Sequence, residues 1–166
     1  MKKILLLLLV IPFIGFSQVG KKEVVDIKWT QVGKLTNPYK FVELEYKEYD
    51  GERTYKLSFQ NMEYMEIVDI GTITFTASQE DIEYIRQTLI DGCLLKKNAE
   101  AITLEIGKGT LLIRPMSGKN NVRMYYDEKG KTLKHTWFTK KQIDKVFKGI
   151  QYFKTDSNFS NRLSNS

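Results

Sequence analysis

Two segments of the sequence share one pattern, in which a strand runs directly into a capped amphipathic helix. The first segment is TFTASQEDIEYIRQTLIDG, residues 74–92, and the second is HTWFTKKQIDKVFKGIQYF, residues 135–153. In the first segment, Ser78 and Asp81 have the spacing of a capping box, where short polar side chains bond to the free N–H groups of the first helical turn. The repeat predicts two helices, each of which directly follows a strand.

The second segment repeats the capping spacing with Thr139 and Gln142. Apolar residues recur at helical spacing in both segments, which predicts one buried stripe on each helix. These residues are Ile82, Ile85 and Leu89 in the first segment, and Ile143, Val146, Phe147 and Ile150 in the second. We expect Gly92 to end the first helix, because glycine adopts the left-handed conformation that closes many helices.

The dipeptide Asp50-Gly51 predicts a two-residue hairpin between strands at residues 41–49 and 52–60. Such a turn aligns apolar residues with apolar residues, in the pairs Val42 with Phe59, Leu44 with Leu57, and Tyr46 with Tyr55. The charged residues of both strands then fall on the opposite face. A slip of one residue would bury those charges, so the register is strongly specified.

Six further strands follow from alternating patterns and turn residues. They are residues 24–32, which Asn37-Pro38 follows; residues 66–76, with Gly71 as a bulge or bend; residues 102–106; the strand that Pro115 ends; residues 122–127; and residues 132–138. Gly107-Lys108 predicts a type II′ turn that pairs Ile102 with Ile113 and Leu104 with Leu111.

The order of elements is four strands and a helix, given twice. Because an apolar sheet face needs a covering layer, we expect the two helices to cover one sheet face or to plug the ends of a barrel. The predicted fold class is α+β, with antiparallel sheets and two ββββα pseudo-repeats in one domain. The units span about residues 24–93 and 101–154, within a single domain of residues 18–154.

The first seventeen residues, MKKILLLLLVIPFIGFS, have the pattern of a signal peptide. A basic start precedes an apolar run that ends in small residues, and this run is short for a membrane span. We expect cleavage between Ser17 and Gln18, export to the periplasm or the outside of the cell, and a mature chain without a transmembrane segment. Residues 155–166 have few apolar side chains, so we expect a disordered tail.

Charge is distributed unevenly along the chain, whose overall net charge is +6. Residues 18–93 hold 9 basic and 14 acidic side chains, a net charge of −5, whereas residues 94–166 hold 15 and 6, a net charge of +9. This asymmetry is typical of a polyanion-binding half, and it also fits two halves of one domain that attract each other.

The residues that catalysis and metal binding require are few. His135 is the only histidine and Cys93 the only cysteine, and neither stands in a zinc-binding or nucleophile-elbow motif. We therefore expect no catalytic residues, no metal site and no cofactor. His135 lies beside Trp137 in a strand, where a partly buried, hydrogen-bonded histidine is the simplest interpretation; a hydrolase using His135 is the alternative. Cys93 has apolar neighbours, which predicts a buried, inert thiol.

The second half offers basic and aromatic side chains on two strands and their turns. Aromatic rings can stack on bases or sugars, and nearby cations neutralise phosphates. The candidate binding residues are Arg114, Arg123, Tyr125, Lys131, Lys134 and Trp137.

A resemblance to known proteins is carried by residues 122–127, Gly130, Phe138-Thr139 and Gln142-Ile143. This stretch resembles the Whirly proteins and the related transcriptional positive-coactivator family, in the order of its elements more than in its residues. The resemblance implies a ββββα unit that binds single-stranded nucleic acid through exposed strands. It would assign that binding to Arg123, Tyr125, Lys131 and Lys134.

Together, these features predict an exported, non-catalytic domain of the cell envelope that binds an unknown protein partner or ligand through a strand face. The alternative is binding of a polyanion or single-stranded nucleic acid through the basic second half.

Overall fold

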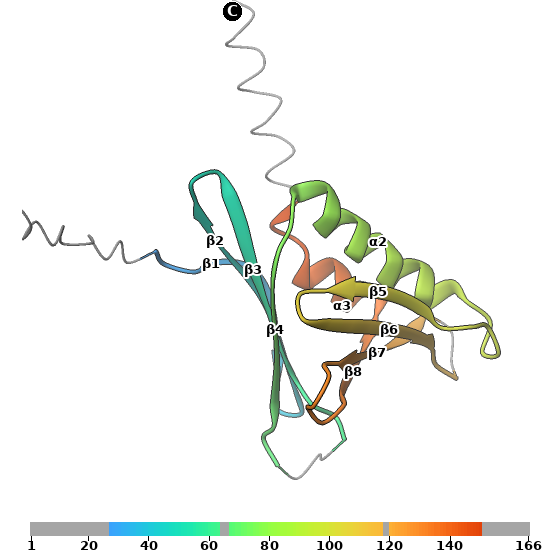
Figure 1. The fold of residues 1–166 in the computed structure, drawn as a ribbon. Helices are drawn as coiled ribbons and strands as arrows, with labels where there is room; N and C mark the ends of the chain where they lie inside the picture. Colours follow the sequence, from blue (N-terminus) through green and yellow to red (C-terminus); the bar gives the residue numbers. More distant parts are fainter. Residues whose placement is uncertain (1–26, 64–66, 118–119, 151–166) are drawn as a thin grey trace, which may run out of the picture.

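The structure, a computed structural model, describes residues 27–63, 67–117 and 120–150. It contains two antiparallel four-stranded sheets and two helices (Figure 1). The first unit consists of β1 (Thr30–Asn37), β2 (Lys40–Tyr49), β3 (Glu52–Gln60), β4 (Ile70–Thr76) and α2 (Gln79–Leu94). The second consists of β5 (Ile102–Ile106), β6 (Gly109–Pro115), β7 (Asn121–Asp127), β8 (Lys134–Thr139) and α3 (Lys140–Val146). The predicted fold class, α+β with two ββββα units, is confirmed.

Four predictions fall on residues that the structure does not describe. They are the signal peptide at residues 1–17, its cleavage between Ser17 and Gln18, the start of the first predicted strand at residues 24–26, and the tail at residues 155–166.

The predicted hairpin registers are confirmed. Strands β2 and β3 pair Val42 with Phe59 and Leu44 with Leu57, as the turn requires. Asp50 and Gly51 both have positive φ, 51° and 78°, which is the backbone of a type I′ turn. The β5–β6 hairpin likewise pairs as predicted: Ile102 with Ile113, and Leu104 with Leu111.

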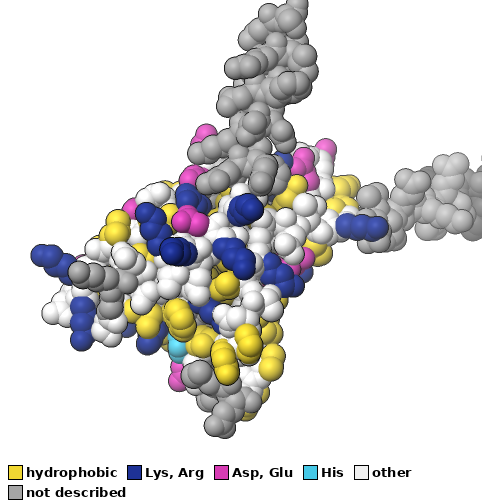
Figure 2. All heavy atoms as spheres, turned by 180° about the vertical axis from the view of Figure 1, so that it is seen from behind, with side chains coloured by type: hydrophobic (Ala, Val, Ile, Leu, Met, Phe, Trp, Pro, Cys, Tyr) yellow, Lys and Arg dark blue, Asp and Glu magenta, His cyan; other side chains and the backbone are white. Residues whose placement is uncertain are grey.

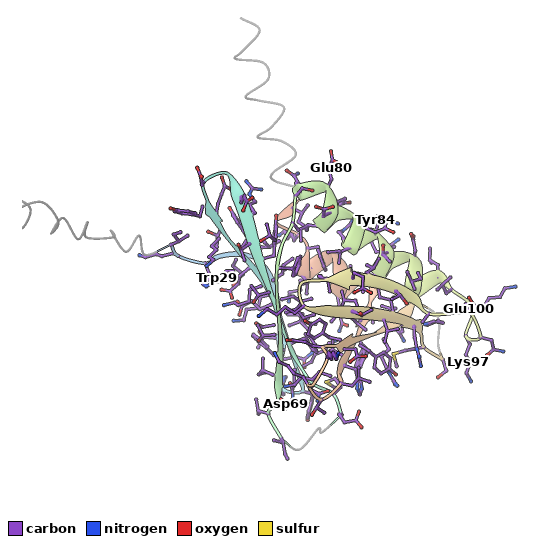
Figure 3. All side chains as sticks on the ribbon, viewed as in Figure 1. Trp29, Asp69, Glu80, Tyr84, Lys97 and Glu100 are labelled. Atoms are coloured by element: carbon purple, nitrogen blue, oxygen red, sulfur yellow. The ribbon has the colours of Figure 1, made fainter. Side chains whose placement is uncertain are left out.

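The outer face of the first sheet holds its charges in cross-strand pairs. Lys56 Nζ lies 2.7 Å from Glu45 Oε2, and Lys34 Nζ lies 3.3 Å from Glu43 Oε1. Trp29 lies on this same side, away from the helices (Figure 3), where the amine of Lys56 is 4.5 Å from the centre of its ring. The charged side chains named here are therefore already paired within the first sheet.

The first and fourth strands differ from the prediction. The first was expected at residues 24–32, but β1 runs from Thr30 to Asn37, with an irregular register between Gln31 and Gly33. The strand extends further because its second half pairs with β2 and buries Leu35. The fourth strand begins at Ile70 rather than at residue 66.

Two glycines serve packing rather than the roles predicted for them. Gly71 pairs in regular register with Phe59 and forms no bulge; a Cβ there would lie 2.6 Å from the tip of the Phe59 ring. Gly92 does not end α2, which continues to Leu94. A Cβ at Gly92 would lie 2.7 Å from Ile113 and 2.8 Å from Val122, so glycine lets the helix approach the second sheet closely.

Each helix covers the sheet of the other unit. Helix α2 packs on β6 and β7, although it follows β4 in the chain, whereas α3 packs on β1 and β2 of the first sheet. An ion pair between Arg86 and Asp144, at 2.6 Å, joins the two helices. Both capping boxes form as predicted. Because the helices are exchanged, residues of both sheets share one hydrophobic core.

The exchange depends on a close crossing of β1 with the end of α3 and the residues that follow it. A Cβ at Gly33 would overlap the carbonyl oxygens of Val146 and Lys145, the latter at 2.5 Å. The amide of Gly149 donates to the carbonyl of Val32 at 3.0 Å. Backbone therefore meets backbone here, with no room for a side chain.

Lys40 is a buried cation at the end of the first sheet. Its side chain shares the inner face with Val42 and Leu44, and the residue is 2% exposed. Its amine donates to the carbonyl of Trp137 and, at 3.0 Å, to Gln142 Oε1. Burial lowers the pKa of this amine to about 8. Lys40 thereby ties the first sheet to β8 and α3.

We expect Lys40 to make stability depend on alkaline pH. Below about pH 8 the amine is charged in both states, and the burial penalty is fully present. Between about pH 8 and the ordinary pKa of 10.5, the Lys40 amine holds more protons in the unfolded chain than in the folded one, so this group contributes a rise of roughly 1–2 kcal/mol to the free energy of unfolding, discounted for partial solvent contact. The buried Cys93 thiol, whose pKa is raised to about 11, opposes this rise above its ordinary pKa of 9.0.

The measurement is urea unfolding at several pH values between 7 and about 10.5. Over this pH range, the free energy of unfolding of the wild type should increase by that amount relative to Lys40→Met, whereas Lys47→Met, on the outer face of the first sheet, should follow the wild type. A difference between wild type and Lys40→Met that does not change with pH would contradict the contribution of Lys40.

Candidate binding face on the second sheet

The second sheet has two different faces. Its inner face packs on α2 through buried apolar residues such as Ile113 and Val122. The outer face carries the alternate residues, which the strand registers place in two cross-strand rows. One row contains Leu112, Tyr125 and His135, and the next contains Arg114, Arg123 and Trp137. We call Arg114, Arg123, Tyr125, His135 and Trp137 the arginine–aromatic face.

Tyr125 is the centre of this face. The guanidinium carbons of Arg114 and Arg123 lie 5.6 and 5.9 Å from the centre of its ring. Arg123 Nη1 also donates to the tyrosine hydroxyl at 3.2 Å. The His135 ring lies 5.3 Å away, inclined by 39°. Two guanidinium groups and the His135 ring therefore surround the Tyr125 side chain.

The two arginines form an unfavourable pair. Arg114 and Arg123 are direct partners across β6 and β7, and like charges in such positions repel. In the described part of the chain, Arg53 and Arg86 each pair with carboxylates, whereas no ion pair joins Arg114 or Arg123 to one. The Nε of Arg123 is buried and has no hydrogen-bond partner there. The positive charge of this pair is therefore uncompensated within these residues.

A shallow cleft of about 200 Å³ opens beside the arginine pair. Its lining residues are Arg114, Pro115, Met116, Ser117, Arg123 and Tyr125. The cleft thus combines two guanidinium groups with a phenol and an alcohol, all of which can donate hydrogen bonds.

His135 lies at the edge of the face that meets the first sheet. Its Nδ1 is 3.2 Å from Glu63 Oε2, and its backbone amide donates to the fully buried Asn61 at 3.1 Å. Burial lowers the pKa of His135, the charge of Arg123 lowers it further, and Glu63 opposes both. In Figure 2 the histidine lies beside an acidic side chain and a group of hydrophobic side chains. The ring is therefore partly buried, as expected, with the Glu63 carboxylate beside its Nδ1.

The structure brings four of the six predicted binding residues together. Arg114, Arg123 and Tyr125 form the centre of the face. Trp137 shares the row of the two arginines, but the Lys40 amine lies 3.9 Å from the centre of its ring and partly covers it. Trp137 is therefore less available to a ligand than its place in the strand predicts.

The two lysines predicted to bind a ligand form ion pairs with carboxylates of this chain instead. Lys131 lies in the turn between β7 and β8, where its amine is 2.8 Å from Glu128. Lys134 pairs with Asp69 and donates to the carbonyl of Ile70 at 3.0 Å. Asp69 lies at the lower end of the first sheet in Figure 3. Both lysines thus serve internal ion pairs.

Sequence reasoning missed three residues that shape this face: Lys40, Glu63 and Ser117. The strand pattern could have identified Lys40, because it is in phase with Val42 and Leu44 on the buried side of β2. No comparable signal existed for Glu63, which lies outside the strands and reaches the face only through tertiary packing, or for Ser117, which lies just after β6.

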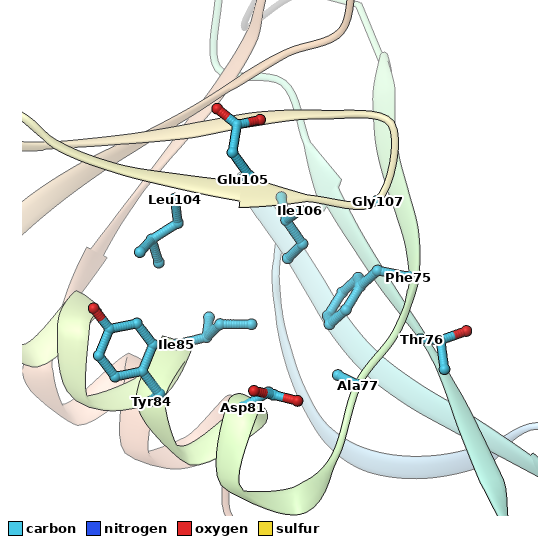
Figure 4. Close-up of a pocket in the computed structure, with 10 residues that line it drawn as sticks. All are labelled: Phe75, Thr76, Ala77, Asp81, Tyr84, Ile85, Leu104, Glu105, Ile106 and Gly107. Atoms are coloured by element: carbon cyan, nitrogen blue, oxygen red, sulfur yellow. The ribbon is translucent and has the colours of Figure 1, made fainter.

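A second hollow, of about 300 Å³, lies between α2, the end of β4 and the β5–β6 hairpin. Figure 4 shows Leu104 and Ile106 pointing from β5 toward Ile85 and Phe75, while Glu105 points away from them. The hollow is therefore largely apolar, and it contains none of the predicted binding residues.

Cys93 is buried at 5% exposure, as predicted, and burial raises the pKa of its thiol to about 11.

Within the described ranges, no group of three or more metal-ligating side chains is close enough to hold an ion. No helix of this part of the chain is long and apolar enough to span a membrane. Searches of protein-family models and of curated proteins found no match to the chain.

Proposed function

We propose that this chain is an exported, non-catalytic domain of the cell envelope that binds a protein partner or ligand through the arginine–aromatic face. The observation that carries the proposal is the pair Arg114 and Arg123, directly opposite each other around Tyr125 with no carboxylate partner in the described residues. A like-charge pair lowers stability, so its presence favours a binding role.

The non-catalytic part of the proposal rests on His135. Its Nδ1 faces Glu63, and the nearest ring to it on the face is Tyr125. A hydrolytic site would need an activated nucleophile beside the histidine. Among the described residues, the hydrogen bonds and ion pairs of His135 involve Asn61, Glu63 and Met62 and include no serine, threonine or cysteine.

Export is proposed from the signal-peptide pattern of residues 1–17. Fractionation of the source cells, followed by mass analysis, should find the protein outside the cytoplasm with Gln18 as its first residue. Full-length protein in the cytoplasm would contradict export.

The binding proposal predicts that the face, and no other surface, retains material from an envelope extract. When an envelope extract is passed over the immobilised chain, we expect the wild type to retain a component that the variant Arg114→Gln/Arg123→Gln does not retain. The matched control, Lys141→Gln/Lys145→Gln, removes two exposed charges from α3 and should retain it fully. Equal retention by all three chains would argue against the proposal.

A second candidate function, binding of a polyanion or single-stranded nucleic acid, is favoured by the net charge of +9 over residues 94–166. It is also favoured by rows of arginine and aromatic side chains on an exposed strand face. Its affinity for a single-stranded oligonucleotide should fall steeply as salt rises. Absent binding, or binding that salt does not weaken, would remove this candidate.

A further inference from the structure

The arginine pair also indicates the chemical class of the ligand, an inference that rests on the proposed function. Arg114 and Arg123 stand side by side on neighbouring strands, and Tyr125 holds both guanidinium groups near its ring. The Arg123–Tyr125 hydrogen bond fixes one guanidinium further. The Arg123 guanidinium is therefore partly oriented before a ligand arrives, which reduces the entropy cost of binding.

We propose that Arg114 and Arg123 together bind a dianionic, tetrahedral oxyanion of the phosphate-monoester type in the cleft beside Tyr125. A guanidinium group presents its N–H donors in a planar fork that matches two oxygens of such an anion. The two positive charges of the pair are compensated by a dianion, whereas a single carboxylate would leave one positive charge uncompensated.

Two local features fit this ligand. The buried Nε of Arg123 has no hydrogen-bond partner in the described residues, so the fold does not use the full donor set of this guanidinium group. Ser117 also lines the cleft and has a hydroxyl group that can donate. The cleft, at about 200 Å³, suits a small charged group rather than a large apolar molecule.

The test is an NMR titration of the purified chain with inorganic phosphate at constant ionic strength, with sulfate and acetate as comparison anions. We expect saturable shifts at the amides of β6 and β7, and tighter binding of phosphate and sulfate than of acetate. Arg114→Gln or Arg123→Gln should weaken phosphate binding about 10-fold or more, because each removes a charge-assisted hydrogen-bond donor.

The control Lys141→Gln/Lys145→Gln, which removes two positive charges where each arginine variant removes one, should leave phosphate affinity within about twofold, since these lysines lie on α3. Absence of saturable shifts, acetate binding as tight as that of phosphate, or equal weakening in the control would each overturn the inference. Thermal unfolding of every variant without phosphate checks that it folds.

Two sources of such a group can be separated. Vesicles that contain phosphatidic acid present a phosphomonoester, whereas phosphatidylglycerol presents only a phosphodiester. Phosphate-competed binding to the first vesicles alone would support the inference with a lipid source; phosphate binding with no vesicle binding would support it with a soluble one. An envelope component retained through the face, without phosphate binding, would overturn this inference and leave the proposed function standing. Phosphate binding without such retention would leave this inference standing and argue against the proposed function.

Discussion

Replacing Gly33 with alanine is expected to destabilise the domain by about 3 kcal/mol or more. The added methyl group would overlap the carbonyl oxygens of Val146 and Lys145, which belong to the backbone and cannot rotate away. The strand and the end of α3 would have to separate, which would weaken the cover of the first sheet. Urea unfolding, followed by circular dichroism, measures the loss.

Gly130→Ala is the matched control, because the same methyl group would meet nothing within 4 Å there. Its φ of 81° favours glycine, so we expect a cost of about 1 kcal/mol from the backbone alone. If Gly33→Ala cost no more than Gly130→Ala, the close crossing of β1 and α3 would be wrong.

Cutting the chain between Lys97 and Asn98 should leave two fragments that do not fold separately. The first fragment would keep α2 but lose the sheet that α2 covers, and the second would lose the sheet that α3 covers. Each sheet would expose an apolar face to water, at roughly 25 cal/mol for each Å². We therefore expect neither fragment, measured alone, to show a cooperative unfolding transition.

An equimolar mixture of the fragments should recover the secondary structure and a cooperative transition, because the exchanged helices can bind across the cut. Circular dichroism of the fragments and of their mixture makes the comparison. A cooperative transition in the fragment that ends at Lys97, measured alone, would show that the helix exchange is not required for folding.

Local features of the fold were predictable because each depends on residues close in sequence. The capping boxes at Ser78 and Thr139 form through side chains three residues away. The hairpin at Asp50-Gly51 follows from the turn and from the apolar pairing. The sheet that each helix covers could not be predicted from the sequence, because the apolar pattern of each helix is compatible with the apolar face of either sheet.

The binding face was predictable only in part, for a related reason. Strand alternation places Arg123, Tyr125 and Trp137 on one face, and the structure agrees. The pairing of Lys134 with Asp69 joins residues far apart in the chain and has no local signal. The pairing of Lys131 with Glu128, three residues apart, could have been anticipated from the sequence.

Site-specific photocrosslinking in the source cells tests the proposed binding face most directly. A photoreactive residue at Leu112 would stand opposite Tyr125 on the face, and one at Thr72 would stand exposed on β4 of the first sheet. The Leu112 position should give a discrete adduct, lost when Arg123 is replaced with glutamine, and the Thr72 position should give none. The same adduct from both positions, or an adduct from Thr72 alone, would contradict binding through the arginine–aromatic face.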